Sequence, residues 1–301
     1  MQKRTGFILC LALGLVLAFL LHRSLFLPAK EEKIMDGFET LLTQEELTVA
    51  QVIAYLDKHI NEVSPENAGK LVLGLEQVQK AKLPAWQRLY EDDNLQQKMA
   101  EVYRRNWALD DLKKVEDETI RPVVAKTVAN GYEIETAEGF FFPVIDYTLY
   151  RKYYGALAAD LTAYFDLMAV ESEETPVKDA ALMIGWAEIL RRAERQERFI
   201  EGYGSSTQVE PVRELLARYV TFALFGCNNT PLFSYETKEM DPEAKQAYIA
   251  YVAQETTGEF SRLIKDYLQV LDAYGFRLTA EVDAFRRQAM DAWGKSPQPP
   301  K

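Results

Sequence analysis

The histidines and the acidic residues limit which metal chemistry this sequence can support. Only His59 of the two histidines lies beyond the N-terminal hydrophobic segment, so a two-histidine zinc site is excluded by number. A site made of carboxylates alone stays open. The acidic residues of segment 171–179, however, lack the ligand spacing of a calcium loop, and such clusters usually form a solvated turn. We therefore expect no metal ion and no cofactor.

A thiol nucleophile with a histidine base is the second possibility, and it would need Cys227 beside His59. Cys227 follows Phe225 and Gly226 at a predicted helix end, where a small buried thiol is the ordinary interpretation. The sequence also has no glycine-rich phosphate loop, no Gly-x-Ser-x-Gly elbow and no dinucleotide fingerprint. No motif has the specificity of a catalytic signature, which favours a non-enzymatic role.

Glu171 is the one residue for which the sequence suggests a catalytic role. Glu171 and Ser172 end a predicted helix and are followed by Ala181, Leu182 and Met183. This pattern resembles lytic transglycosylases of the lysozyme type, in which a helix-terminal Glu before Ser is the general acid and a Gly-Leu-Met-Gln segment lies downstream. The resemblance covers residues 169–183 of 301, and segment 179–184 supplies neither the Gly nor the Gln. It implies glycan cleavage with Glu171 as general acid.

The helices that must position these residues are predicted from caps and from apolar residues three and four positions apart. Thr48 with Gln51 has a capping-box pattern, Ser64 precedes a proline at the next helix start, and Thr207 with Glu210 forms another box. The sequence therefore predicts a mainly α fold: a multi-helix domain with one short β-hairpin, behind an N-terminal transmembrane anchor.

Two helices are expected to flank Glu171. The first takes Asp146 as its cap and carries an apolar stripe over residues 147–168. The second opens at Thr175 and Pro176 and interleaves four arginines with glutamates, among them the pair Glu188 and Arg192. We interpret these arginines as a salt-bridged outer face rather than an anion site.

A β-hairpin is expected near residues 132–145, after Asn130 and Gly131. Apolar and acidic residues alternate over residues 132–136, and three phenylalanines follow a Glu-Gly pair. Pro143 should place the second strand at an edge. The aromatic residues Phe140 to Phe142, Tyr147 and Tyr150 leave a small-ligand pocket open as a third alternative.

The N-terminus has the features of a membrane anchor. Lys3 and Arg4 precede an uncharged run over residues 6–21, which reaches membrane-spanning length if it continues through Leu27 with Arg23 snorkelling. No small-residue pair suits signal cleavage. We expect an uncleaved single-pass anchor over residues 6–27, with the N-terminus cytoplasmic and the domain extracytoplasmic.

The charge of the domain limits its partners. The net charge is −11, and because the first 30 residues hold four basic and no acidic residues, the remainder carries −15. Such a surface repels phosphate backbones, so nucleic acid is not an expected partner. A protein or a cell-wall component is the partner that we expect.

Four segments are expected: 1–30 as membrane anchor or signal segment, 31–130 as an N-terminal helical part, 131–295 as the hairpin plus a C-terminal helical part, and 296–301 as a mobile tail. The leading hypothesis is a non-enzymatic, membrane-tethered binding or structural domain of a bacterial cell envelope. The two alternatives are a glycan-cleaving enzyme and a small-ligand-binding domain.

Overall fold

The computed structural model describes residues 29–106, 109–254 and 256–293, and these residues are mainly helical with a few short antiparallel strand pairs. Residues 29–42 are helical. The other helices, of which η1 and η2 are 3₁₀ helices, are η1 (Ile60–Glu62), η2 (Tyr147–Ala156), α2 (Val49–His59), α3 (Pro65–Leu89), α4 (Asp93–Asn106), α5 (Asp110–Lys114), α6 (Ile120–Ala129), α7 (Ala159–Glu173), α8 (Trp186–Gly202), α9 (Val209–Phe225), α10 (Pro242–Val252), α11 (Glu259–Ala273) and α12 (Ala280–Ala292). The predicted helical class is confirmed.

The predicted anchor over residues 6–27 lies outside the described residues. Within the described ranges, no helix combines the length and the apolar character that crossing a membrane requires.

Side-chain caps explain where several helices begin. The Thr48 hydroxyl accepts a hydrogen bond from the Gln51 amide, and the Gln51 side chain accepts one from the Thr48 amide at 2.8 Å, so the predicted capping box is present. Ser64 caps α3 by accepting a hydrogen bond from the Asn67 amide. The box predicted at Thr207 is wrong, because α9 begins after Gln208 and has no side-chain cap.

The long helix predicted from Asp146 is two elements in the structure. Asp146 caps η2, and extended backbone at Leu157 and Ala158 separates η2 from α7. The buried tyrosines of η2 are Tyr147, Tyr150 and Tyr153. Their spacing of three matches the three residues per turn of a 3₁₀ helix, which explains why an α-helical interpretation of this stripe failed.

No helix starts at Thr175 and Pro176. The chain instead forms the strands β3 (Val177–Lys178) and β4 (Ala181–Leu182), and helix α8 starts only at Trp186. Asp179 and Ala180 both have positive φ, 49° and 56°, as the two central residues of a type I′ turn require. A third strand pair joins β5 (Gly226–Cys227) to β6 (Thr230–Pro231).

The predicted hairpin is present as β1 (Tyr132–Ala137) and β2 (Phe140–Ile145), which pair with each other and with no other strand of the described residues. The register runs from Tyr132 opposite Ile145 to Ala137 opposite Phe140. Glu133, Glu135, Phe142 and Val144 therefore share one face of the sheet.

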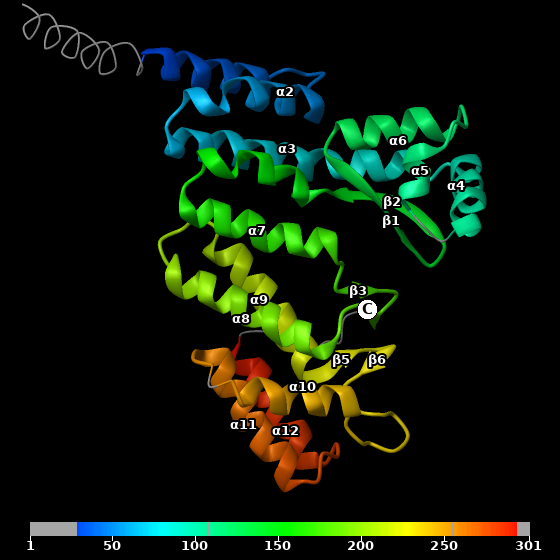
Figure 1. Ribbon diagram of the computed structural model, residues 1–301, viewed down its shortest axis with the longest axis vertical. Coiled ribbons are helices and arrows are strands. Elements are labelled where there is room, and N and C mark those ends of the chain that lie inside the picture. Colours follow the sequence, from blue (N-terminus) through cyan, green and yellow to red (C-terminus); the bar gives the residue numbers. More distant parts are fainter. Residues whose placement is uncertain (1–28, 107–108, 255, 294–301) are drawn as a thin grey trace, which may run out of the picture.

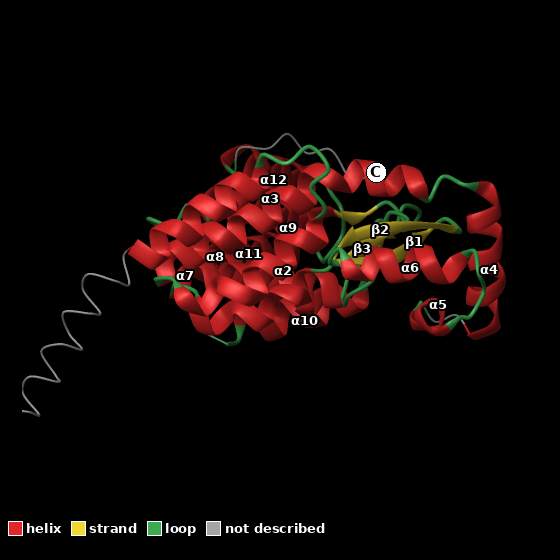
Figure 2. Ribbon diagram, turned by 90° about the horizontal axis from the view of Figure 1, so that it is seen from above, coloured by secondary structure: helices red, strands yellow, loops and turns green. Residues whose placement is uncertain are grey.

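Figures 1 and 2 show a helical body from which a smaller lobe projects to one side. We define the lobe as residues 93–145, which comprise α4 to α6 and the β1–β2 hairpin, and the body as the remaining described residues. The lobe has its own core around Met99, Leu112 and Phe141. A second core joins α2 and α3 to η2 and α7, so it draws on residues from both of the expected parts 31–130 and 131–295.

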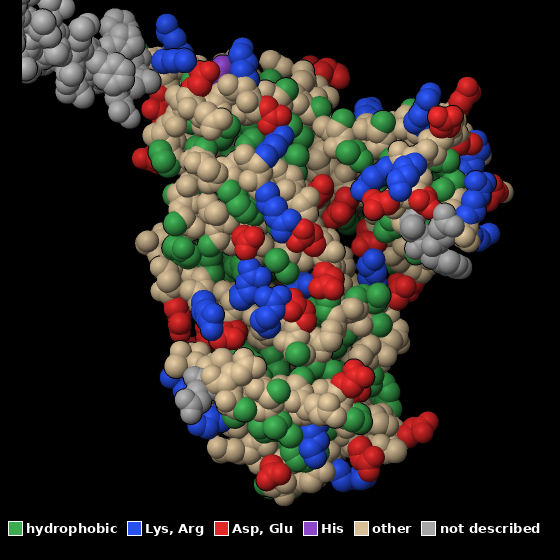
Figure 3. Space-filling model, in the orientation of Figure 1, with side chains coloured by type: hydrophobic (Ala, Val, Ile, Leu, Met, Phe, Trp, Pro, Cys, Tyr) green, Lys and Arg blue, Asp and Glu red, His purple; other side chains and the backbone are tan. Residues whose placement is uncertain are grey.

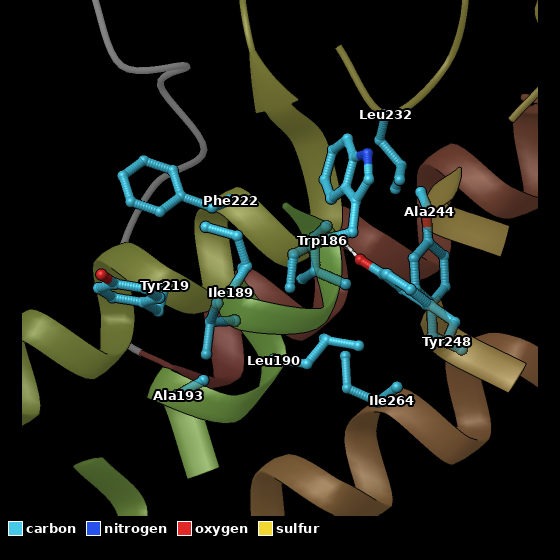
Figure 4. Close-up of a cluster of buried hydrophobic side chains, with 14 of the residues drawn as sticks. Trp186, Ile189, Leu190, Ala193, Tyr219, Phe222, Leu232, Ala244, Tyr248 and Ile264 are labelled. Atoms are coloured by element: carbon cyan, nitrogen blue, oxygen red, sulfur yellow. Dashed lines mark hydrogen bonds between the residues drawn. The ribbon is translucent and has the colours of Figure 1, made fainter. Parts of the chain in front are cut away.

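The largest core lies in the lower half of the body and joins α8 to α12. Figure 4 shows Trp186 of α8 beside Tyr248 of α10 and Leu190 of α8 beside Ile264 of α11, while Ile189 lies on the side of Tyr219. Trp186 is only 5% exposed, and the Tyr248 hydroxyl donates a hydrogen bond to the carbonyl of Ala223. This core holds α8 firmly, and α8 in turn positions the charged residues described next.

Candidate functional site

Glu171 lies in the last turn of α7 and connects that helix to two others. Its Oε1 atom accepts a hydrogen bond from the Tyr219 hydroxyl of α9 at 2.6 Å and lies 3.3 Å from Nη1 of Arg192 of α8. The Glu171 side chain is only 14% exposed. The carboxyl group therefore fastens the end of α7 to α8 and α9.

Arg192 is the centre of this network and is 2% exposed. Its guanidinium lies 2.7 Å from Oε1 of Glu188 and 3.1 Å from Oε2 of Glu174, and it also donates to the Glu174 carbonyl at 2.9 Å. The interpretation of this arginine as part of an outer face is wrong. The guanidinium can be buried because several acceptors, including Glu171, satisfy its donors.

Two opposing influences act on the protonation of Glu171. Burial raises its pKa, while the Tyr219 hydrogen bond and the Arg192 charge lower it, and the net direction is upward. Arg192 also contacts Glu188 at 2.7 Å and Glu174 at 3.1 Å, so Glu171 is one of three carboxylates that compensate its charge.

Glu171 also lines a cavity of about 520 Å³ between the hairpin and the body. Phe142, Val144 and Phe222 are among its apolar walls. Its charged lining residues are Glu133, Glu135, Glu171, Lys178, Asp179 and Arg218. An apolar cavity with a few converging charged groups has the composition of a ligand site.

Glu133 is the site residue that the sequence did not reveal. It lies on β1, is half-buried, and lines both this cavity and an adjoining hollow of about 540 Å³. Burial, with the nearby charges of Asp146 and Glu135, raises the pKa of Glu133 to about 7, while Lys113 and Lys178 oppose the rise. The alternation of residues 132–136 shows only that Glu133 faces away from the lobe core. It does not show that the body covers that face.

A third hollow, of about 590 Å³, lies at the hairpin tip. We call these three adjoining spaces together the cleft. All three spaces share Thr136 and Lys178 in their walls. Figure 3 shows acidic side chains on both sides of the hollow between the lobe and the body. Lys178 crosses it to Glu135 at 2.7 Å, and the Thr175 hydroxyl donates to the same carboxylate at 3.2 Å.

The other candidate residues do not converge on the cleft. Cys227 is 2% exposed in the largest core, where burial raises its pKa to about 11, and His59 packs on Tyr55 at the opposite end of the body. The structure therefore forms no dyad of Cys227 and His59. Among the described residues, no group of acidic, histidine or cysteine side chains is arranged to hold a metal ion.

The aromatic residues Phe140 to Phe142, Tyr147 and Tyr150, here called the aromatic cluster, do not gather in one pocket. Successive side chains of β2 point to opposite faces of the sheet, which divides the cluster. Phe140 is 65% exposed at the hairpin tip, Phe141 is buried in the lobe core, and the Tyr150 hydroxyl donates to the buried Gln79 side chain. Only Phe142 and Tyr147 of this cluster line the 520 Å³ cavity.

Comparison of the chain with protein-family models, with curated proteins and with solved structures finds no match.

Proposed function

We propose that this protein is a non-enzymatic, membrane-tethered binding domain of a bacterial cell envelope, and that it takes its ligand into the cleft between the lobe and the body. The observation that carries the proposal is the 520 Å³ cavity, whose apolar walls surround Glu133, Glu171 and Arg218. Two of these charged groups come from the body and one from the lobe. A ligand in the cavity would therefore contact both parts of the molecule.

The tether is supported by the uncharged run over residues 6–21, which the predicted anchor extends to residue 27, and by the helix that follows it. Ile34 and Phe38 of this helix are buried in the second core. Glu31 accepts hydrogen bonds from the Ser64 hydroxyl and from the Asn67 side chain at 2.7 Å. The body thus begins within a few residues of the predicted anchor, with no long linker between them.

Photo-crosslinking in intact cells tests the binding role. Photoreactive benzoylphenylalanine replaces either Met183, which is 55% exposed and lines the cleft, or Ile249, which is 47% exposed on α10 outside it. We expect membrane-associated adducts from position 183 and none from position 249. If position 183 and a second cleft position, Thr136, both give no adduct, the cleft is not a binding site.

Glycan cleavage is the second candidate function, favoured by the presence of Glu133 and Glu171 in one cavity. Both carboxyl groups have a raised pKa, and a pair of carboxyl groups is what most glycoside hydrolases use. Under our leading proposal the protein releases no fragments from peptidoglycan.

The deciding measurement compares the full-length protein with Glu171→Gln and with Glu236→Gln, a control that removes an exposed charge outside the cleft. Released fragments are measured by mass, and the three proteins are first matched for thermal stability. If the parent and Glu236→Gln cleave while Glu171→Gln is slower by roughly a hundredfold or more, as expected for a lost general acid, the non-enzymatic proposal fails.

A further inference from the structure

The two edges of the β1–β2 hairpin differ in how their main-chain groups are satisfied. The Asp146 amide donates to the Gly131 carbonyl at 3.1 Å, which places one ladder bond at this position, although the Gly131 amide itself donates to the Val128 carbonyl. Because hydrogen-bonded pairs alternate along an antiparallel ladder, the main-chain groups of Glu133 also point toward β2. Those of Tyr132, Ile134 and Thr136 therefore point outward, as the next observation confirms.

The Thr136 amide donates a hydrogen bond to the side chain of Glu135 at 2.9 Å rather than to β2. Pro143, which has no amide, lies opposite Ile134 at a position where the ladder needs no donor. The register is thus consistent along the whole hairpin.

The outer edge of β2 is covered. The Gln96 side chain of α4 accepts from the Phe141 amide at 2.9 Å and donates to the Phe141 carbonyl at 2.7 Å. The next outward position is Pro143, and the Ile145 carbonyl accepts from the Ser172 hydroxyl at 3.2 Å. Helices α4 and α7 thus occupy the positions that an added strand would need on this side.

The outer edge of β1 is open within the described part of the chain. Its only strand partner there is β2, and the edge lines the 540 Å³ hollow at Ile134 and Thr136. Ile134, whose side chain packs in the lobe core, lines the hollow at a position where its main-chain groups point outward from the hairpin. An unpaired strand edge facing a hollow can accept a further extended chain.

The charges around this edge select the side chains of such a chain. The acidic lining residues are Asp110, Glu133, Glu135, Glu173 and Glu174. The two basic ones, Lys113 and Lys178, are already paired with Asp110 at 2.8 Å and with Glu135 at 2.7 Å. Within the described residues Glu133 has no ion pair, so a cation from a ligand would gain one there.

We propose that the cleft binds an extended peptide segment that carries lysine or arginine and pairs as a third strand with the open edge of β1. This inference rests on the proposed binding function of the cleft and names its partner class. Main-chain hydrogen bonds to Ile134 and to the Thr136 carbonyl hold the segment, and its basic side chains face Glu133. A second copy of this chain would bring another acidic edge to the cleft and is disfavoured by charge.

The test uses the full-length protein in non-ionic detergent and a labelled eight-residue peptide of alternating lysine and valine, with binding followed by fluorescence anisotropy. The first comparison peptide is N-methylated on alternate amides, which removes main-chain donors on one edge but keeps the charge. The second replaces lysine by glutamate. We expect the methylated peptide to bind at least tenfold more weakly and the acidic peptide not to bind.

Two variants locate the binding site. Glu133→Gln should weaken binding of the lysine peptide at least threefold, whereas Glu236→Gln, which removes an exposed charge outside the cleft, should leave it unchanged. Equal binding of the methylated peptide, equal effects of the two variants, or a protein dimer that excludes the peptide would each overturn the inference. If that happens while position 183 still crosslinks, the cleft remains a binding site for another ligand. If neither peptide binding nor crosslinking occurs, the proposed function fails as well.

Discussion

Arg192 has the strongest influence on stability that we infer for a single residue. Its guanidinium is 2% exposed and joins α8 to Glu171 and Glu174 at the end of α7. Removing one partner of a buried ion network leaves the others desolvated and unpaired, which costs more than the network contributes when intact. Arg191, the residue before Arg192, pairs with Glu188 but its side chain is 50% exposed, so solvent can replace its contacts.

We expect Arg192→Ala to lower the free energy of unfolding by about 3 to 5 kcal/mol, the range for a broken buried ion pair. Arg191→Ala should lower it by about 1 kcal/mol or less. Urea unfolding followed by circular dichroism gives both values. Similar losses for the two variants would show that Arg192 has no special structural role.

Glu133 should make stability depend on pH. Its pKa is about 7 in the folded protein and near 4.5 when exposed, so the folded state holds the extra proton between these values. The contribution of Glu133 to stability is therefore greatest below about pH 4.5 and is lost as the pH rises through 7. Glu133→Gln, which cannot ionise, should gain roughly 1 to 3 kcal/mol relative to the parent between pH 4.5 and 8. Unfolding curves at both pH values measure this difference, and a constant difference would show that Glu133 is not desolvated.

At the scale of elements, turn chemistry decided where sequence-based prediction succeeded. The β1–β2 hairpin was predictable because Gly131 and Gly139 adopt positive φ and flank the alternating strands. The β3–β4 turn places Asp179 and Ala180 at positive φ, and the residue types there give no comparable signal. Both the β1–β2 hairpin and the β3–β4 hairpin line the cleft. The sequence therefore predicted the wall formed by β1–β2 and missed the wall formed by β3–β4.

The helices show a similar limit. A capping box located α2, and a serine before a proline located α3, because a cap is formed by residues close in sequence. The burial of Arg192 depends on contacts with α7 and α9, which no local pattern encodes. Glu171 was found from the sequence as a helix-terminal acid, but its partners were not.

An alanine-to-glycine substitution should change the free energy of unfolding in opposite directions at Ala180, whose backbone is strained, and at Ala187, which lies in a helix. Ala180→Gly removes a Cβ from a backbone with φ of 56°, where left-handed geometry disfavours it, and should raise the free energy of unfolding by about 0.5 kcal/mol. Ala187→Gly, at an exposed position of α8, should lower it by about 1 kcal/mol. Thermal unfolding distinguishes the two signs, and a loss at both positions would mean that the turn is unstrained.

At the scale of the whole molecule, the helix over residues 29–42 sets where the protein can be separated from its predicted anchor. It contributes Ile34 and Phe38 to the second core and Glu31 to the α3 cap. Removing this helix would expose that core.

We expect a chain that begins at Ala29 to be soluble and folded, while the full-length protein sediments with membranes and resists alkaline extraction. A chain that begins at Thr43 should be less stable, because it lacks the buried side chains of the first helix. Fractionation and circular dichroism test these expectations. Sedimentation of the Ala29 form with membranes would show that attachment does not depend on residues 6–27.

The contacts of Gln96 with Phe141 also set a limit on growth of the sheet. A two-stranded ribbon with two open sides can template a chain of further ribbons, as in a fibril. Here one amide side chain occupies a donor and an acceptor on one side, so addition can proceed only from the other. A strand bound at β1 therefore gives a three-stranded sheet that can extend on one side only, through the outer edge of the bound strand.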